Sequence, residues 1–248
     1  MRKLILPIFV SCLSVSFTII PTVQKNNSNS YPAVISLSLH DSTVISPANP
    51  DAAATLYAAL NLQQYGLSCE AFEYAWKGYQ HLLATKKIVR SEYLTICDFS
   101  QSSKKKRFYL IDIANNKLVL NTYVTHGRNS GREYAVRFSN RPKSLQSSLG
   151  FYVTQNTYFG EHGLALKING VDAGYNDKAF QRNIVIHGSV YAEGRWLRRS
   201  GYLGRSFGCP AIPKKESRTI INTIKNGTCL FIYHPGKAYL LGSKILNG

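Results

Sequence analysis

The hydrophobic periodicity of this chain changes at Tyr93, and this change constrains the fold more than any other feature. Before it, Phe72, Ala75, Trp76 and Tyr79 recur at the spacing of an amphipathic helix with a buried aromatic face. After it, short runs follow the period of two that is typical of strands. No regular alternation of strands and helices follows that would indicate a parallel sheet. We therefore predict a mainly β fold with peripheral helices, preceded by a small helical segment.

The order of the runs divides the chain into a linker over residues 24–48, a helical segment over 49–92 and a main domain over 93–248. In the helical segment, Gly66 ends a first helix and Ser68 caps a second one. The runs that predict strands are residues 93–99, 108–113, 117–124, 150–154, 164–168, 184–186 and 228–233, and residues 214–226 predict a further helix. We expect the basic run Lys104–Arg107 to be a solvated loop and His126 to be a surface histidine.

Residues 1–23 have the composition of an export signal. Met1-Arg2-Lys3 is positively charged, residues 4–13 are apolar, and residues 14–16 are small. The apolar character continues to Ile20, so an uncleaved anchor that associates the protein with a membrane is the alternative. In either case we expect an exported protein of the periplasm or cell envelope, which is an oxidising compartment.

The cysteines are interpreted with that compartment in mind. Cys69 and Cys97 either form a disulfide or are two buried free thiols, because spacing alone does not decide connectivity. Cys229 lies in an apolar run and is expected to be a small buried residue of a strand. Cys209 lies instead in a polar, electropositive loop, where an exported protein risks oxidation of a thiol that has no function.

The formal net charge of +17 predicts affinity for polyanions such as nucleic acid, anionic lipid or an acidic cell-wall polymer. No helix-turn-helix signature or paired Cys/His zinc pattern accompanies the basic residues, so we do not expect nucleic acid as a partner. No set of Cys, His and Asp residues has the spacing of a metal site, and no glycine-rich phosphate loop is present. We expect no cofactor.

The stretch 183–213 contains the parts of a thiol nucleophile. An apolar run ends at His187-Gly188, and Cys209 follows Gly208 further along the stretch. Taken singly, a buried cysteine and a carbonyl-bonded histidine are usually structural. Together they can form a thiolate–imidazolium pair, with the backbone N–H groups of Gly208 and Cys209 placed to stabilise an oxyanion. The carbonyl of Gly188 is our candidate for orienting the histidine ring through its other nitrogen.

These residues carry a resemblance to a known family. Residues 108–233 resemble the L,D-transpeptidase catalytic domain, the YkuD-like family of bacterial cell-wall enzymes, in its murein L,D-transpeptidase branch. The matching motifs are Ile186-His187-Gly188, the run Ser206-Phe207-Gly208-Cys209-Pro210-Ala211, the strand 146–154, and the segments 162–166 and 170–176. Two positions depart from the family pattern: Phe207 stands where a histidine is common, and Ala211 where an asparagine is common.

The resemblance implies a β-sandwich catalytic domain and a cysteine acyltransferase acting on peptidoglycan stem tetrapeptides. Cys209 would form a thioester acyl-enzyme with His187 as base, giving cross-links when an amine resolves it or trimmed stems, by L,D-carboxypeptidase activity, when water does. The candidate substrate contacts are Ser206, Arg205, Tyr152, Tyr191 and Arg195. The alternative is a non-catalytic module on the same scaffold that binds the cell envelope or a polyanion.

Overall fold

The structure, a computed structural model, describes residues 50–248, so the predicted export signal and linker lie outside the described residues. Within this range, no helix has the length and apolar character needed to cross a membrane. The helices are α1 Pro50–Ala59, η1 Leu62–Tyr65, α2 Cys69–Ala84, η2 Val190–Ala192, α3 Gly194–Ser200, α4 Lys214–Ile224, α5 Lys237–Gly242 and α6 Lys244–Asn247. The strands are β1 Tyr93–Asp98, β2 Phe108–Asp112, β3 Lys117–Thr122, β4 Gly150–Gly160, β5 Gly163–Gly170, β6 Val185–Ser189, β7 Ala211–Pro213 and β8 Cys229–Tyr233.

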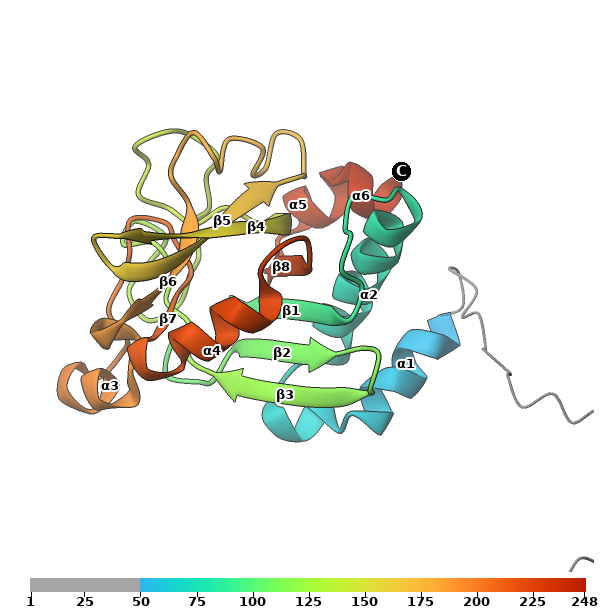
Figure 1. The fold of residues 1–248 in the computed structure, drawn as a ribbon, viewed down its shortest axis with the longest axis horizontal. Helices are drawn as coiled ribbons and strands as arrows, with labels where there is room; N and C mark the ends of the chain where they lie inside the picture. The colour runs from blue at the N-terminus through green and yellow to red at the C-terminus, as the bar shows by residue number, and fades with distance from the viewer. Residues whose placement is uncertain (1–49) are drawn as a thin grey trace, which may run out of the picture. The chain divides into compact units, whose positions relative to one another are not determined.

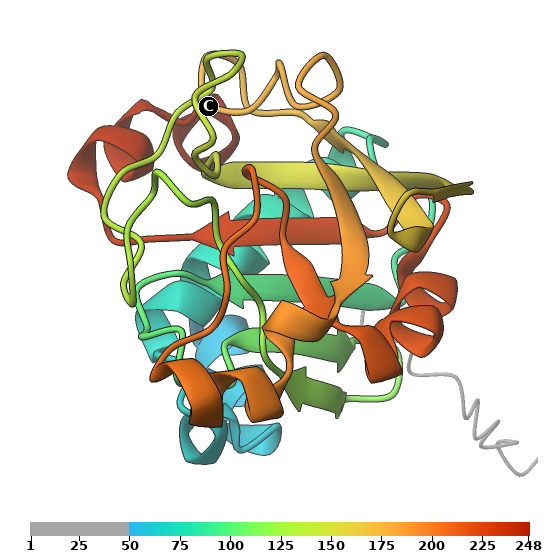
Figure 2. The same ribbon diagram turned by 90° about the vertical axis from the view of Figure 1, so that its left-hand side faces the viewer.

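The strands form one mixed sheet in the order β3-β2-β1-β8-β4-β5-β6-β7. Neighbouring strands are antiparallel except for the pairs β1–β8 and β6–β7, which are parallel. The sheet curls strongly, so that β6 and β7 run across the direction of β1 and β8 and the whole approaches a closed barrel (Figure 2). Helices lie around this sheet rather than alternating with its strands (Figure 1). The predicted mainly β fold with peripheral helices and a preceding helical segment is confirmed.

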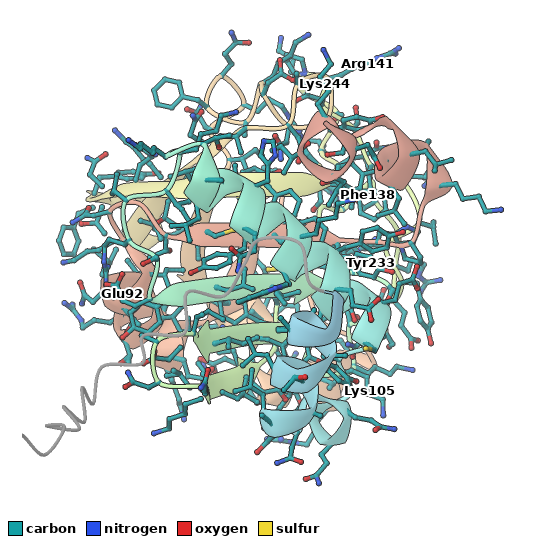
Figure 3. All side chains as sticks on the ribbon, turned by 90° about the vertical axis from the view of Figure 1, so that its right-hand side faces the viewer. Glu92, Lys105, Phe138, Arg141, Tyr233 and Lys244 are labelled. Carbon is teal, nitrogen blue, oxygen red and sulfur yellow. The ribbon has the colours of Figure 1, made fainter. Side chains whose placement is uncertain are left out.

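Helix α2 covers one face of the sheet, and Figure 3 views the molecule from the side on which this helix lies in front of the strands. Ser68 caps it as predicted, since its Oγ accepts the N–H of Ala71 at 3.1 Å. Its apolar side, including Trp76, is buried against the core. Below it, the rings of Phe151 in β4 and Phe231 in β8 stack with centroids 4.1 Å apart. The aromatic stripe of the helix therefore serves packing, as its spacing indicates.

Several elements differ from the sequence-based expectation. The first helix ends at Ala59, because Asn61 adopts a left-handed conformation (φ 51°), and the chain reaches Gly66 through the short turn η1. Strand β4 continues to Gly160, beyond the predicted residue 154. Helix α3 was not predicted: none of its residues is buried, so it has no hydrophobic period to detect.

The four cysteines of the described residues are free thiols. Cys97 in β1 and Cys229 in β8 are fully buried, which confirms the interpretation of Cys229 as a core residue. Cys69 begins α2 and is half-buried, with its thiol on Glu73 Oε1 at 3.3 Å. Of the two alternatives for Cys69 and Cys97, the structure therefore has the free thiols.

Candidate active site

A cleft of about 450 Å³ opens beside β6, and we name it the Cys209 cleft. The turn between β4 and β5 forms one wall, and the chain entering β6 forms another. Polar and aromatic side chains from separate parts of the sequence line it, among them His162, Arg182, His187, Tyr191, Arg205, Ser206, Phe207 and Cys209. The structure thus brings together Cys209, His187, Tyr191, Arg205 and Ser206 of the predicted site.

Cys209 is half-buried in this cleft, with its sulfur against the chain that enters β6. The Val185 N–H donates to Sγ at 3.5 Å, and the carbonyl oxygen of Asn183 lies 3.7 Å from the same sulfur. Burial raises the pKa of the thiol, while the N–H of Val185, the charge of Arg182 and the residue's own N–H lower it. Because burial is the largest of these effects, the resting thiol keeps its proton and needs a base to become a nucleophile.

His187 lies on β6 beside the strand that follows Cys209, because β6 and β7 pair in parallel with His187 opposite Ala211. Its Nδ1 lies 3.3 Å from the carbonyl oxygen of Gly188. A carbonyl only accepts, so Nδ1 carries the hydrogen and Nε2 is left as the basic nitrogen. Burial lowers the pKa of His187, which keeps the ring neutral and ready to take a proton.

Gly188 has a packing role in addition to its carbonyl. A Cβ at this position would collide with the Ser217 hydroxyl of α4, and would lie 3.2 Å from the Cα of Lys214. The absence of a side chain therefore lets α4 lie directly against β6 and support the strand that holds His187.

The turn before Cys209 is built around Gly208 and Ser206. Gly208 has φ 127°, a conformation that other residues rarely adopt, and a Cβ there would lie 2.8 Å from the Gln146 carbonyl oxygen. Ser206 Oγ accepts the Gly208 N–H at 3.1 Å and donates to the Cys209 carbonyl oxygen at 2.6 Å. The Gly208 N–H is therefore occupied, unlike in the two-donor oxyanion site predicted from sequence. The Cys209 N–H has no backbone or side-chain oxygen acceptor within residues 50–248 and remains the available donor.

Two of the predicted substrate contacts lie elsewhere. Tyr152 is fully buried in β4, and its hydroxyl donates to the Ser148 carbonyl at 3.1 Å. Arg195 lies on α3 and pairs with Glu193 at 2.6 Å, outside the Cys209 cleft. Their sequence neighbourhood suggested the site, but Tyr152 lies in the part of β4, residues 150–154, that is buried on both faces of the sheet, and Arg195 lies on α3 with its guanidinium on Glu193.

Arg182 was not predicted as a site residue. Its guanidinium donates to the carbonyl of Ser139 at 2.6 Å, to the carbonyl of Gln146 at 2.5 Å, and to the hydroxyls of Ser144 and Ser148. It ties the loop over residues 139–148 to the wall of the cleft while keeping a positive charge near the Cys209 sulfur. The one sequence feature that could have indicated this role is the position of Arg182, two residues before the apolar run that begins at Ile184.

A buried pair of Arg107 and His126 lies next to the Cys209 turn. It overturns the prediction for His126 and, at Arg107 alone, that of a solvated basic run, because Lys104, Lys105 and Lys106 are exposed as predicted. Arg107 is fully buried rather than solvated, and His126 is 1% exposed rather than on the surface. Arg107 Nη2 donates to His126 Nδ1 at 2.7 Å, and Nε donates to the Val124 carbonyl at 3.1 Å. Both residues are buried because the chain after β3 folds back over the sheet, which no local pattern reveals.

The segment over residues 125–128, which contains His126, forms backbone hydrogen bonds with the residues on either side of Cys209. The Thr125 N–H donates to the Ala211 carbonyl at 2.9 Å, and the Ser206 N–H donates to the His126 carbonyl at 3.0 Å. The Arg128 N–H donates to the Ser206 carbonyl at 2.8 Å. The backbone on both sides of Cys209 is therefore fixed by hydrogen bonds to one segment, which restricts the positions available to the thiol.

A family model described as the L,D-transpeptidase catalytic domain matches residues 63–233. The chain belongs to this family. The match begins at residue 63 rather than near residue 108, so the family region also includes η1 and α2. No curated protein sequence matches the chain.

Solved structures that match part of this L,D-transpeptidase family member have low sequence identity to it. An L,D-transpeptidase from Mycobacterium smegmatis is 12% identical over 58% of this chain and 59% of its own, with a TM-score of 0.35. An L,D-transpeptidase from Stackebrandtia nassauensis is 10% identical over 74% of this chain and 76% of its own, also with a TM-score of 0.35. The chain thus spans less than two thirds of the mycobacterial protein. The family assignment rests on the family model that matches residues 63–233.

Proposed function

We propose that this protein is an exported cysteine acyltransferase that acts on the tetrapeptide stems of peptidoglycan through a thioester on Cys209. The observation that carries the proposal is the Cys209 cleft itself. It holds a half-buried thiol and a neutral imidazole whose Nδ1 is committed to the Gly188 carbonyl. Family membership supports the reaction class, because this family is named for L,D-transpeptidase catalysis.

The proposed reaction has two acyl-transfer steps. His187 Nε2 takes the proton of the Cys209 thiol, and the thiolate attacks the carbonyl carbon of the third stem residue. The tetrahedral oxyanion accepts the Cys209 N–H. As the bond to the terminal D-Ala breaks, imidazolium returns its proton to the leaving amine. An amine of a neighbouring stem then attacks the thioester and loses its proton through His187, releasing the thiol and a cross-linked product.

Water in place of the amine gives a trimmed stem instead. The choice between cross-linking and L,D-carboxypeptidase activity therefore depends on which nucleophile reaches the thioester. Arg205 and Tyr191 line the cleft and are our candidates for contacting the stem. The Arg205 guanidinium also lies over the Tyr202 ring at 5.8 Å, and Arg132 lies over the same ring at 5.5 Å. Such stacked arginines suit the carboxylates of a stem peptide.

The test is incubation with a disaccharide-tetrapeptide, followed by intact-protein mass spectrometry and an assay of released D-Ala. Wild type should release D-Ala, while Cys209→Ala and His187→Ala should release none above background. Cys69→Ala is the matched control, because Cys69 is a half-buried thiol on α2 outside the cleft, and it should behave as wild type. A folded wild type that releases no D-Ala and forms no adduct would contradict the proposal.

The alternative function is a non-catalytic module that binds an anionic polymer of the envelope. The observation that favours it is charge: within the described residues only Arg90, Lys104 and Arg195 form ion pairs with carboxylates. The excess of unpaired cations suits a polyanion. This alternative predicts salt-sensitive binding to the polymer that is unchanged in Cys209→Ala, with no D-Ala release by wild type.

A further inference from the structure

The base of the proposed reaction has a second ring beside it. His162, in the turn between β4 and β5, stacks on His187 with ring centroids 4.5 Å apart and planes 23° apart. His162 is exposed and lines the Cys209 cleft, whereas His187 is 3% exposed. Core packing does not explain this contact, because the ring of His162 is exposed. It lies flat on the buried ring of His187 in a cleft that also holds a thiol.

The other contacts of His187 leave its ring plane weakly fixed. Its hydrogen bond to the Gly188 carbonyl is long, at 3.3 Å, and comes from the adjacent residue. No carboxylate or amide side chain within residues 50–248 bonds to His187, so in this part of the chain its ring is oriented by the Gly188 carbonyl alone among hydrogen-bond acceptors. The stack against His162 supplies a second constraint, because a flat ring contact restricts rotation about the bond that joins the imidazole to Cβ.

We propose that His162 is a positioning residue for the base: its ring holds His187 in plane and supports the imidazolium that forms when Cys209 gives up its proton. The inference rests on the proposed function. A neutral aromatic face attracts a cation stacked on it, whereas a second imidazolium at the same distance repels it. The same contact therefore supports proton transfer when His162 is neutral and opposes it when His162 is charged.

Other charges near the two rings must stay constant for this effect to be measured. The titratable and charged groups that line the cleft with the pair, or contact its lining, are Tyr158, Glu161, Lys167, Arg182, Tyr191, Arg205 and Cys209. Burial is the main cause that lowers the pKa of His187, and the charge of His162 lowers it further. A comparison between variants at residue 162 alone leaves all these groups in place.

The experiment measures the alkylation rate of Cys209 by iodoacetamide between pH 5.5 and 8, followed by peptide mass spectrometry. Cys97 and Cys229 are fully buried, and a Cys69→Ser background removes the remaining half-buried thiol of the described residues. His162→Ala should lower the rate at pH 8 by roughly 2- to 10-fold, which is the range for losing one aromatic pair. His162→Phe keeps a flat ring and should stay within about 2-fold of wild type at pH 8.

Rescue by a flat ring separates this role from a structural one. The rate of His162→Phe should stay near that of wild type while that of His162→Ala falls, because only the flat ring is shared by phenylalanine and histidine. Phe159→Ala is the control for the turn: its side chain is 74% exposed and does not line the cleft, so its rate should equal that of wild type. Melting temperatures verify that the variants are folded.

Two results would overturn the inference: a His162→Ala rate equal to wild type at pH 8, or a His162→Phe rate as slow as that of His162→Ala. A His187→Ala arm distinguishes these from failure of the proposed function. If His187→Ala does not slow alkylation, then the Cys209–His187 pair itself is wrong. If it does slow alkylation while substitutions of His162 have no effect, then only the role of His162 is wrong.

Discussion

Acid should destabilise this protein through His126, and the structure gives the size of the effect. Burial, together with the charge of Arg107, lowers the pKa of His126 from 6.5 to about 3. As the pH falls below 6.5, the unfolded chain takes up a proton that the folded chain refuses. The free energy of unfolding therefore drops as the pH falls, by about 2 kcal/mol between pH 8 and pH 5 and by about 5 kcal/mol once the pH is below 3.

The matched variant is His126→Gln, whose amide oxygen can accept the Arg107 hydrogen bond but does not titrate. Urea unfolding of both proteins at several pH values from 8 to 5 gives the difference in their free energies of unfolding, in which the other histidines cancel. We expect wild type to lose about 2 kcal/mol relative to the variant over this range. Curves that stay parallel would refute the argument that His126 is buried in its neutral form.

Three further substitutions test the surroundings of the nucleophile. Gly208→Ala forces a Cβ toward the Gln146 carbonyl at φ 127°, and should lower the free energy of unfolding by about 1–3 kcal/mol in urea titrations and slow alkylation of Cys209. Arg182→Lys keeps the positive charge but replaces a fork of donors with a single ammonium, and should lower the free energy of unfolding by about 2–3 kcal/mol and slow alkylation of Cys209; an unchanged rate would show that the hydrogen bonds of the fork do not position the sulfur. Tyr152→Phe removes one buried hydroxyl, and should cost about 1 kcal/mol in urea while leaving D-Ala release intact.

The strands and the candidate pair of His187 and Cys209 could be predicted because each has a local pattern in the sequence. The period of two in residues 93–99 and 108–113 reflects a pleat with buried sides, and these residues are β1 and β2. His187 and Cys209 stood out because each follows or precedes a glycine at the end of an apolar run. The Gly188 carbonyl was also expected near the histidine ring, because no acidic or amide residue adjoins His187 in sequence.

What the sequence did not predict depends on tertiary folding. A run of four basic residues is normally solvated, yet Arg107 is buried because the Val124 and Gln101 carbonyls and His126 accept its hydrogens. His162 reaches His187 only because the hairpin of β4 and β5 is longer than its apolar core, which ends near residue 154. Whether a cation is buried, and what the end of a hairpin contacts, both depend on residues that are distant in sequence.

The two departures from the family motif affect the cleft unequally. Ala211 is fully buried at the start of β7, where its backbone pairs with β6 and accepts the Thr125 N–H, so a small residue there keeps the Cys209 turn against the sheet. Phe207 is 65% exposed at the cleft, and the Arg128 guanidinium lies over its ring at 5.7 Å. Neither side chain bonds to His187 or to the Cys209 sulfur. We therefore expect the exposed Phe207 to influence which ligand the cleft accepts and the buried Ala211 to influence only the support of the turn, with neither altering the transfer of the thiol proton.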